Sequence, residues 1–452
     1  MKEVRKEVGK LLYNAEQLQS VASDMLKEAA RLGAQQAEVN IGANIGFSVT
    51  AQSGDVETVE YHQDKSADIT VYFGKRSGSA SLSDLTPQAI HAAVAAACHI
   101  AKFTDEDPAA GLADKDELAF HYPQLESAFP WALTVEEAIK LTCECERDAM
   151  SLDKRIMRAE DVRVATGEGL SVYANSQGFM GAFPFTRHEM SCVLIAKEKD
   201  EMQQDYGYTV ATDPTQLESA AVIARQAVER AVRRLGARHL PTMKAPVIFA
   251  AEEARGFLGH FVAAISGGSI YRKTSFLVDQ LGKKIFPDFI SMQEHPHLAR
   301  ALGSSPFDND GVATRENIFI ENGYLQQYAM GVYSARKLNS KTTGNAGGVH
   351  NLTIHHGNKN LADLIKQMDK GLLVTDMMGN GVNIMTGDYS RGVAGFWIEK
   401  GEIQYPVHEI TIASTLQDMY ARIVDVGNDI DIRGNIRTGS ILIEEMMIAG
   451  SA

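Results

Sequence analysis

An internal repeat constrains the fold of this 452-residue chain more than any other feature of its sequence. Residues 46–53 (GFSVTAQS) match residues 169–176 (GLSVYANS) at Gly, Ser, Val, Ala and Ser, and each segment leads to a glycine at a turn, Gly54 and Gly178. Both segments stand within the same order of patterns, a helix, a strand-rich stretch and a second helix. Such a unit must bury one face of its sheet, so we expect the two copies to supply that cover for each other.

The pattern of apolar residues locates the two units. Helical spacing and turn punctuation predict helices at residues 15–33 and 88–102 in the first unit and at residues 134–152 and 213–235 in the second, with strands at 156–210. We therefore interpret the first half of the chain as a duplication of a helix–β-meander–helix unit.

The second half is richer in glycine and in β-branched residues. It begins with a buried strand at 247–250 and a helix at 252–265. Residues 400–402 (KGE) form a favourable hairpin turn, and further strands are predicted at 317–321, 325–333, 372–376, 394–399 and 403–414. The prediction is an α+β protein, with a duplicated α+β domain at residues 1–240 and a β-dominated domain at residues 241–452.

The charge balance is acidic. Lys and Arg total 44 and Asp and Glu total 58, a formal net charge of −14. This balance argues against a surface that coats nucleic acid or docks on an anionic membrane, because both need a basic face. The densest basic stretch, residues 225–238 (RQAVERAVRRLGAR), is on a predicted helix and is expected to present a solvated face.

Neither a membrane-spanning segment nor an export signal is visible in the sequence. The four cysteines do not form a disulfide framework, because two are neighbours at i and i+2 and none lies after Cys192. We expect a soluble cytoplasmic protein.

The 13 histidines raise the question of a metal site. The zinc-peptidase motifs H-E-x-x-H and H-E-x-x-x-H are both absent. Glu253 and His260 share the predicted helix but lie two turns apart, about 10 Å, which is too far for joint ligation. Other histidines lie in segments predicted to be strand or loop. They are His188 with Cys192, His295 with His297, and the cluster of His350, His355 and His356.

A polar, glycine-rich segment, residues 385–399 (MTGDYSRGVAGFWIE), precedes the predicted hairpin. Its composition allows backbone amides to face a ligand or a partner chain, and it equally suits a bend in a curved sheet.

Several segments together resemble the TldD/PmbA family over nearly the whole chain, and most closely its subunit without zinc. They are residues 247–252 (VIFAAE), 267–275 (GGSIYRKTS), 305–311 (SPFDNDG), 334–338 (SARKL), 343–348 (TGNAGG) and 386–392 (TGDYSRG). The resemblance implies a two-domain α+β fold and a cytoplasmic two-subunit zinc peptidase that trims or degrades unfolded peptides, including microcin precursors and antitoxins. An older label of the family is "modulator of DNA gyrase".

The same resemblance separates this chain from the catalytic subunit. In the TldD subunit, zinc is held by a helical H-E-x-x-x-H and by a cysteine far downstream. The matching segment here, residues 250–260 (AAEEARGFLGH), has no histidine pair at that spacing, and Cys192 is the last cysteine. The resemblance therefore implies no metal ligand or cofactor in this chain, with zinc expected in a TldD-like partner.

We expect an accessory subunit, either in a heterodimer with that partner or as a homodimer in isolation, that helps to hold an extended peptide at a free sheet edge. The candidate residues for substrate or partner binding are Gly387, Asp388, Tyr389, Arg391, Gly392 and His260. Two alternatives stay open. One is a self-sufficient hydrolase with a metal site built from His350, His355, His356 or His260, and the other is a binding module that modulates its target without catalysis.

Overall fold

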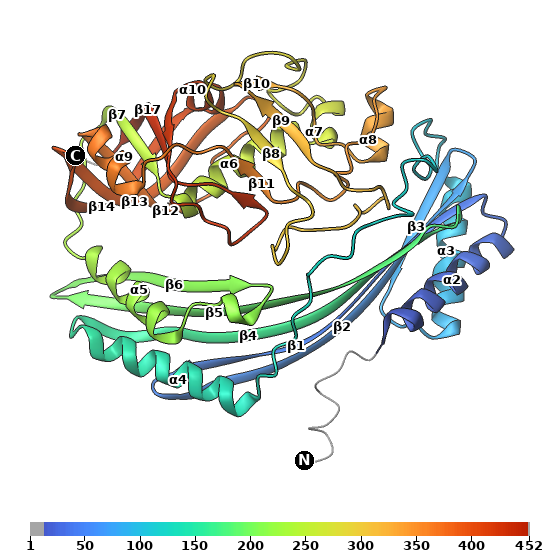
Figure 1. The fold of residues 1–452 in the computed structure, drawn as a ribbon, viewed down its shortest axis with the longest axis horizontal. Coiled ribbons are helices and arrows are strands. Elements are labelled where there is room, and N and C mark those ends of the chain that lie inside the picture. Colours follow the sequence, from blue (N-terminus) through green and yellow to red (C-terminus); the bar gives the residue numbers. More distant parts are fainter. Residues whose placement is uncertain (1–12, 451–452) are drawn as a thin grey trace.

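The computed structural model describes residues 13–450, in which a β-rich domain lies above a long curved sheet flanked by helices (Figure 1). The elements of the first half are α2 (Ala15–Arg31), β1 (Gln36–Gln52), β2 (Asp55–Phe73), β3 (Arg76–Leu82), α3 (Pro87–Phe103), α4 (Val135–Leu152), β4 (Ile156–Asn175), β5 (Met180–Glu198), β6 (Glu201–Ala211) and α5 (Ala220–Arg233).

The repeat is built into a single antiparallel sheet with the strand order β3-β2-β1-β4-β5-β6. Gly46 pairs with His62 in the first hairpin and Gly169 pairs with Phe185 in the second, so the offset that relates the two glycines also relates their partners. The central strands β1 and β4 join around the pair Ile45–Glu168, which marks a local two-fold axis.

Side-chain caps start the helices where the sequence offers them. Asn14 and Thr134 each accept a hydrogen bond from the backbone three residues on, and the side chain at that position, Gln17 or Glu137, accepts from the backbone N–H of the capping residue. The first helix of each unit therefore begins with the same device, which fixes where the helix meets its strand.

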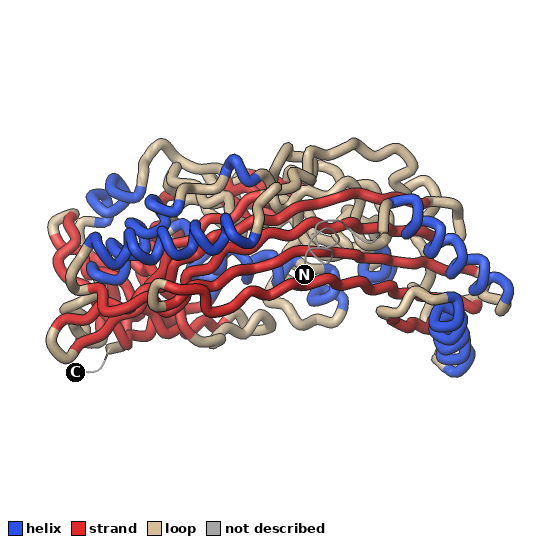
Figure 2. Tube along the Cα trace, turned by 90° about the horizontal axis from the view of Figure 1, so that it is seen from below, coloured by secondary structure: helices blue, strands red, loops and turns tan. Residues whose placement is uncertain are grey.

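The two units do not cover each other as expected. They lie side by side, and each pair of helices packs at its own end of one sheet face (Figure 2). Val39 packs under the first pair and Val49 under the second, and both are odd positions of β1 and so share a face. The units merge because β1 and β4 are hydrogen-bonded to each other, and the opposite, concave face is left to the C-terminal domain (Figure 1).

The elements of the second half are β7 (Met243–Phe249), α6 (Ala251–Ile265), α7 (Gly267–Tyr271), β8 (Met292–Glu294), β9 (Asn317–Glu321), β10 (Tyr324–Leu325), α8 (Val332–Lys337), β11 (Leu352–Ile354), α9 (Leu361–Met368), β12 (Gly371–Met378), β13 (Asp388–Glu399), β14 (Glu402–Thr415), α10 (Leu416–Ala421), β15 (Ile423–Val426), β16 (Ile436–Arg437) and β17 (Ile441–Ala449).

Five of these strands close on themselves. They follow the order β14-β13-β12-β7-β17, and β14 also pairs with β17, which completes a barrel. α6 packs its apolar stripe on the largest core cluster, where Phe257 stacks on Phe249 with ring centroids 5.4 Å apart. A smaller sheet, β10-β9-β8-β11-β16, borders the barrel. The fold is α+β, as predicted.

Three predicted elements are wrong in extent. The strand expected at 394–399 begins six residues earlier, at Asp388. The strand expected at 325–333 ends at Leu325, because Ala329 N–H donates to Ile265 O and Met330 N–H donates to the Thr343 hydroxyl instead of to a ladder. The helix expected from residue 213 begins at Ala220. Asp213 caps a separate single turn, Pro214–Gln216.

None of the helices formed by residues 13–450 has the length and apolar character needed to cross a lipid bilayer.

Candidate functional site

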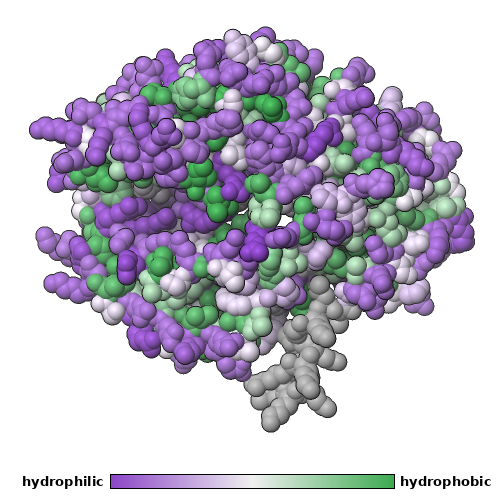
Figure 3. Space-filling model, viewed as in Figure 1, coloured by the Kyte–Doolittle hydropathy of each residue, from purple (hydrophilic) through white to green (hydrophobic). Residues whose placement is uncertain are grey.

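A cleft runs between the N-terminal sheet and the C-terminal domain. It consists of two adjoining cavities of about 600 Å³ each, which share Tyr208 and Thr209 of β6. β5 and β6 line one side, and the start of α6 with residues 429–437 lines the other. The space-filling view shows the surface hollowed along this boundary (Figure 3). An exposed strand edge and a helix N-terminus thus face the same space.

Glu252 lies in the first turn of α6 and is held from both domains. Tyr206 of β6 donates its hydroxyl to Glu252 Oε1 at 2.6 Å, and Arg230 of α5 donates to Oε2 at 3.0 Å. Arg433 Nη2 reaches the same Oε2 at 3.3 Å. Burial by itself would raise the pKa of Glu252, but Arg230, Tyr206 and Arg433 outweigh it and lower that pKa. Glu252 is therefore an ionised interdomain anchor.

Arg433 and Arg255 form a clamp on the Tyr208 strand. The Arg433 guanidinium lies 4.1 Å from the centre of the Tyr208 ring and donates to the Tyr208 carbonyl at 3.1 Å. Arg255 donates to the Tyr208 hydroxyl at 3.0 Å. The buried Asp431 pairs with both guanidinium groups, so the two positive charges are held in place.

The basic stretch at 225–238 is partly solvated, as expected at Arg225 and Arg238, and partly turned toward the C-terminal domain. Arg234 bridges Asp205 of β6 and Asp376 of β12, at 3.3 and 3.0 Å. Arg233 lies over the Phe396 ring of β13 at 4.9 Å. With Arg230 paired to Glu252 of α6, these arginines join α5 to the C-terminal domain.

Glu253 is the titratable group of the cleft whose ionisation falls near neutrality. Burial, then the neighbouring Glu252 and Asp376, raise the pKa of its carboxyl to about 7, although Arg391 acts in the opposite direction. Because Glu253 lines the first cavity, it can carry a proton or a charge toward a bound molecule.

Three of the residues suggested by the sequence, His260, Tyr389 and Arg391, lie close to one another. The His260 and Tyr389 rings contact edge to face, with centroids 5.9 Å apart, and His260 Nε2 is buried without a hydrogen-bond partner. Burial and the nearby Arg391 lower the pKa of His260. Arg391 donates to the Met378 carbonyl at 3.1 Å. His260 is thus a neutral imidazole in an aromatic and cationic setting.

The other three have local roles in the structure. Gly387 has a φ of +85°, and a Cβ there would meet the Gln417 side chain at 1.9 Å, so this turn requires glycine. Asp388 accepts a hydrogen bond from the Thr386 hydroxyl at 2.6 Å. Gly392 pairs with Met378 of β12.

The free sheet edge expected at residues 387–392 is not there. β13 lies inside the barrel between β12 and β14. Before its pairing with β12 begins at Gly392, the loop after β12 covers its edge, where Ser390 N–H donates to Gly381 O and Asn383 N–H donates to Asp388 O. The free edge of the cleft belongs to β6, which pairs only with β5.

Within residues 13–450, the histidines singled out in the sequence do not belong to one cluster of three or more possible metal ligands. His188 bonds Thr166 and the Phe129 carbonyl within a buried stretch of β5. In residues 13–450, the group of three or more histidine, cysteine or acidic side chains close enough to share an ion is a different one, His239, His408 and Glu409. His260, His350, His355 and His356 are not members of this group.

The residues that organise the cleft are Tyr206, Tyr208, Arg230, Asp431 and Arg433, and sequence reasoning missed them as site residues. The sequence feature that could have pointed to them was the density of arginine at 225–238. It indicated a concentration of positive charge but not which acidic residues would pair with it.

Family models match three consecutive parts of the chain. They describe PmbA/TldA metallopeptidase domain 1 at residues 37–101, the central domain at 129–235 and the C-terminal domain at 242–450. A crystal structure described as a modulator of DNA gyrase, from Bacteroides thetaiotaomicron, has a TM-score of 0.91 and 26% identity, covering 97% of this chain and all of that one. TldE from Thermococcus kodakarensis shares the fold, with a TM-score of 0.84 and 19% identity over 95% of this chain and 100% of that one.

Similarity to curated relatives extends over the full length. Metalloprotease PmbA of Escherichia coli O157:H7 is 46% identical over 98% of this chain and 99% of its own. A PmbA homolog of Haemophilus influenzae is 43% identical over the whole of both chains. The chain therefore belongs to the TldD/PmbA family, the family its motifs resemble, and to the PmbA, or TldE, branch of it.

Proposed function

We propose that this chain is the accessory, peptide-holding subunit of a cytoplasmic two-subunit zinc peptidase, and that a TldD-like partner carries the metal. The observation that carries the proposal is the start of α6, where the catalytic subunit of the family is expected to place its H-E-x-x-x-H. Here that turn holds Glu252, which is bound by Arg230, Arg433 and Tyr206.

The residues at this place do not fit a zinc ion. Two guanidinium groups already occupy the Glu252 carboxylate, and their charge opposes a cation. His260 stands two turns further along the helix against Tyr389, and the sequence has no cysteine after Cys192. No step of peptide cleavage is therefore assigned to this chain.

The cleft does suit an extended peptide. β6 presents its unpaired edge along both cavities. Arg230 and Arg433 donate to the carbonyls of Tyr206 and Tyr208, so an added strand would take over acceptors that side chains now satisfy. Peptide capture through the backbone fits a family whose substrates are unfolded segments rather than one sequence.

The test is reconstitution. The chain and a TldD-like protein from the same genome are purified separately without chelators, analysed for zinc, and assayed alone and mixed on an unfolded peptide. We expect zinc in the partner and cleavage by the mixture. Peptide cleavage by this chain alone would instead favour the self-sufficient hydrolase.

A second arm tests the cleft. Tyr208→Pro removes a backbone donor of the β6 edge region, and Tyr324→Pro makes the same change in the edge strand β10, away from the cleft. We expect the first variant to bind a labelled peptide more weakly and the second to bind it as the unaltered chain does. Equal binding by both variants would remove β6 from the proposal.

A further inference from the structure

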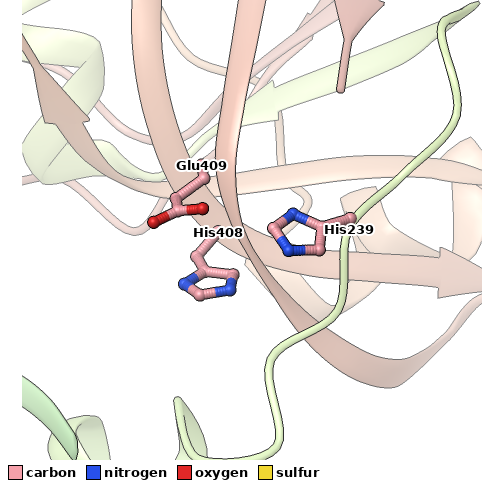
Figure 4. A group of neighbouring side chains, drawn as sticks. All are labelled: His239, His408 and Glu409. Carbon is pink, nitrogen blue, oxygen red and sulfur yellow. The ribbon is translucent and has the colours of Figure 1, made fainter. Parts of the chain in front are cut away.

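Three side chains from two separate segments converge at the junction of the domains, away from the cleft. His239 belongs to the linker between α5 and β7, and His408 and Glu409 belong to β14 (Figure 4). One ligand atom from each lies within 4.8 Å of the other two. The two imidazole rings are stacked with their centroids 5.2 Å apart.

The backbone of β14 is shaped to present two consecutive side chains on one side. Val393 pairs with Ile410 and Gly395 pairs with Val407, so His408 and Glu409 together oppose Ala394 in a β-bulge. In a regular strand, neighbouring side chains point to opposite faces. The bulge removes that alternation, and Glu409 adopts a φ of +51°, a left-handed conformation that is unfavourable for a residue with a Cβ.

The linker that carries His239 is held by backbone hydrogen bonds at the three residues just before it. Arg238 N–H donates to the Pro406 carbonyl at 2.9 Å, in a parallel bridge with β14. Two residues earlier, Gly236 N–H donates to the Glu201 carboxylate at 2.8 Å, and Ala237 N–H does so at 3.2 Å. Backbone hydrogen bonds therefore fix His239 opposite the bulge.

Two imidazole nitrogens and a carboxylate are the donor set that zinc and similar divalent ions accept. Ligands around such an ion lie about 2.0–2.2 Å from it, so small rotations of these side chains are enough to surround it. His239 and Glu409 are exposed and His408 is half-buried, which leaves room for water on the ion.

We propose that His239, His408 and Glu409 bind a divalent cation of the zinc class. The ion clips the interdomain linker to the barrel, and at least one coordination position stays open to water. This site is independent of the peptidase proposal, because it lies outside the cleft and uses none of the residues on α6.

The experiment uses full-length protein without a histidine tag, since a tag would compete for the metal. The protein is depleted with a chelator, dialysed, and titrated with Zn²⁺ against a chromophoric competitor. A second titration with Co²⁺ records the visible absorption bands that report its coordination. We expect one equivalent of Zn²⁺ to bind and the Co²⁺ bands of bound nitrogen and oxygen ligands to develop at the same stoichiometry.

The double variant His239→Ala/His408→Ala is expected to lose affinity by a factor on the order of 10–100 or more. The matched control is His355→Ala/His356→Ala, which removes two exposed histidines elsewhere and is expected to bind like the unaltered protein. Glu409→Gly deletes a ligand where the backbone already favours glycine, so it weakens binding without disturbing the bulge.

Loss of binding in the first variant and in Glu409→Gly, with retention in the control, supports the site. The absence of a bound equivalent in the unaltered protein would overturn it. Equal binding by all four proteins would also overturn it, because the metal would then be adventitious.

Discussion

At the scale of single residues, the molecule holds carboxyl groups that ionise well above their usual range. Glu253 in the cleft has a pKa raised to about 7. Glu38 lies at the second contact between the domains, where Tyr72 and Tyr173 donate to it at 2.7 and 2.9 Å. Burial raises the pKa of Glu38 to about 6, and the charge of Asp310 contributes to the rise. Both groups therefore change charge within the range of ordinary buffers.

Glu253 predicts a pH dependence of peptide binding that rests on the proposed function. Its carboxyl becomes anionic as pH rises through about 7, so a peptide with a free amino terminus should then bind more tightly. One partly hydrated charge pair contributes about 1 kcal/mol, roughly a fivefold change in affinity. Fluorescence anisotropy between pH 6 and pH 8 measures it. Glu253→Gln should flatten the curve, while Glu229→Gln, at an exposed position of α5, should leave it unchanged.

The raised pKa of Glu38 predicts that the folded protein becomes less stable as pH rises. A carboxyl that is protonated more easily in the folded protein contributes stability that is complete below about pH 4.5 and is lost as pH rises through about 6. Glu38→Gln should remove up to about 2 kcal/mol of that decline. Urea unfolding at pH 4.5 and pH 7 measures the difference. An unchanged pH dependence in the variant would show that the decline comes from other groups.

Sequence reasoning reached some of these residues and not others. His260, Tyr389 and Arg391 were selected from a family resemblance, and the structure brings them together. Arg230 and Arg433 could not be found in this way, because each ion pair joins positions about 20 to 180 residues apart. A charge pattern in the sequence indicates that an arginine needs a partner, but not which one the fold supplies.

At the scale of elements, β2 is unusual because it extends well beyond β3, the strand that pairs with its outer edge. β3 begins to pair with it at Ala67, so residues 55–66 have one unpaired edge, and almost all of them are exposed. Val56, Val59 and Tyr61 expose apolar surface there. An unpaired edge with apolar side chains is a surface on which another chain can add a strand.

Within the proposed heterodimer, we predict that this part of β2 contacts the TldD-like subunit. Val59→Lys places a charge on the edge and should sharply reduce recovery of the TldD-like partner in a co-purification, without lowering the melting temperature. Val222→Lys, at an exposed position of α5, is the control and should leave recovery unchanged. Full recovery with both variants would place the contact elsewhere.

Element prediction succeeded where local signals were complete. α2 and α4 begin at side-chain caps and show regular apolar spacing, and both were found close to their true bounds. The stretch at 325–333 failed because its β-rich composition says nothing of the distant groups, such as Ile265 O and the Thr343 hydroxyl, that take its backbone hydrogen bonds. Barrel closure through β14 and β17 was equally invisible, since strand partners are set by the tertiary fold.

At the scale of the whole molecule, ion pairs hold the concave sheet face against the barrel. Arg433→Ala should destabilise the folded protein by about 2 kcal/mol, because it leaves the buried Asp431 and Glu252 with fewer partners. Arg422→Ala removes a mostly exposed pair with Glu445 and should cost less than about 0.5 kcal/mol. Chemical unfolding followed by fluorescence measures both, and equal losses would argue against an energetic role of the clamp.

The two-fold axis through Ile45 and Glu168 is also the symmetry expected if the first half arose by duplication. Two separate copies of one helix–meander–helix unit, paired edge to edge as a homodimer, would meet along antiparallel central strands with this symmetry. Joining the two copies into one polypeptide keeps the contact and frees each half to diverge. The first unit carries the long overhanging β2, and the second unit is followed by Arg234, which pairs with Asp376 of the barrel strand β12. The two halves of one symmetric sheet therefore differ, since one leaves an open strand edge and the other is tied to the barrel.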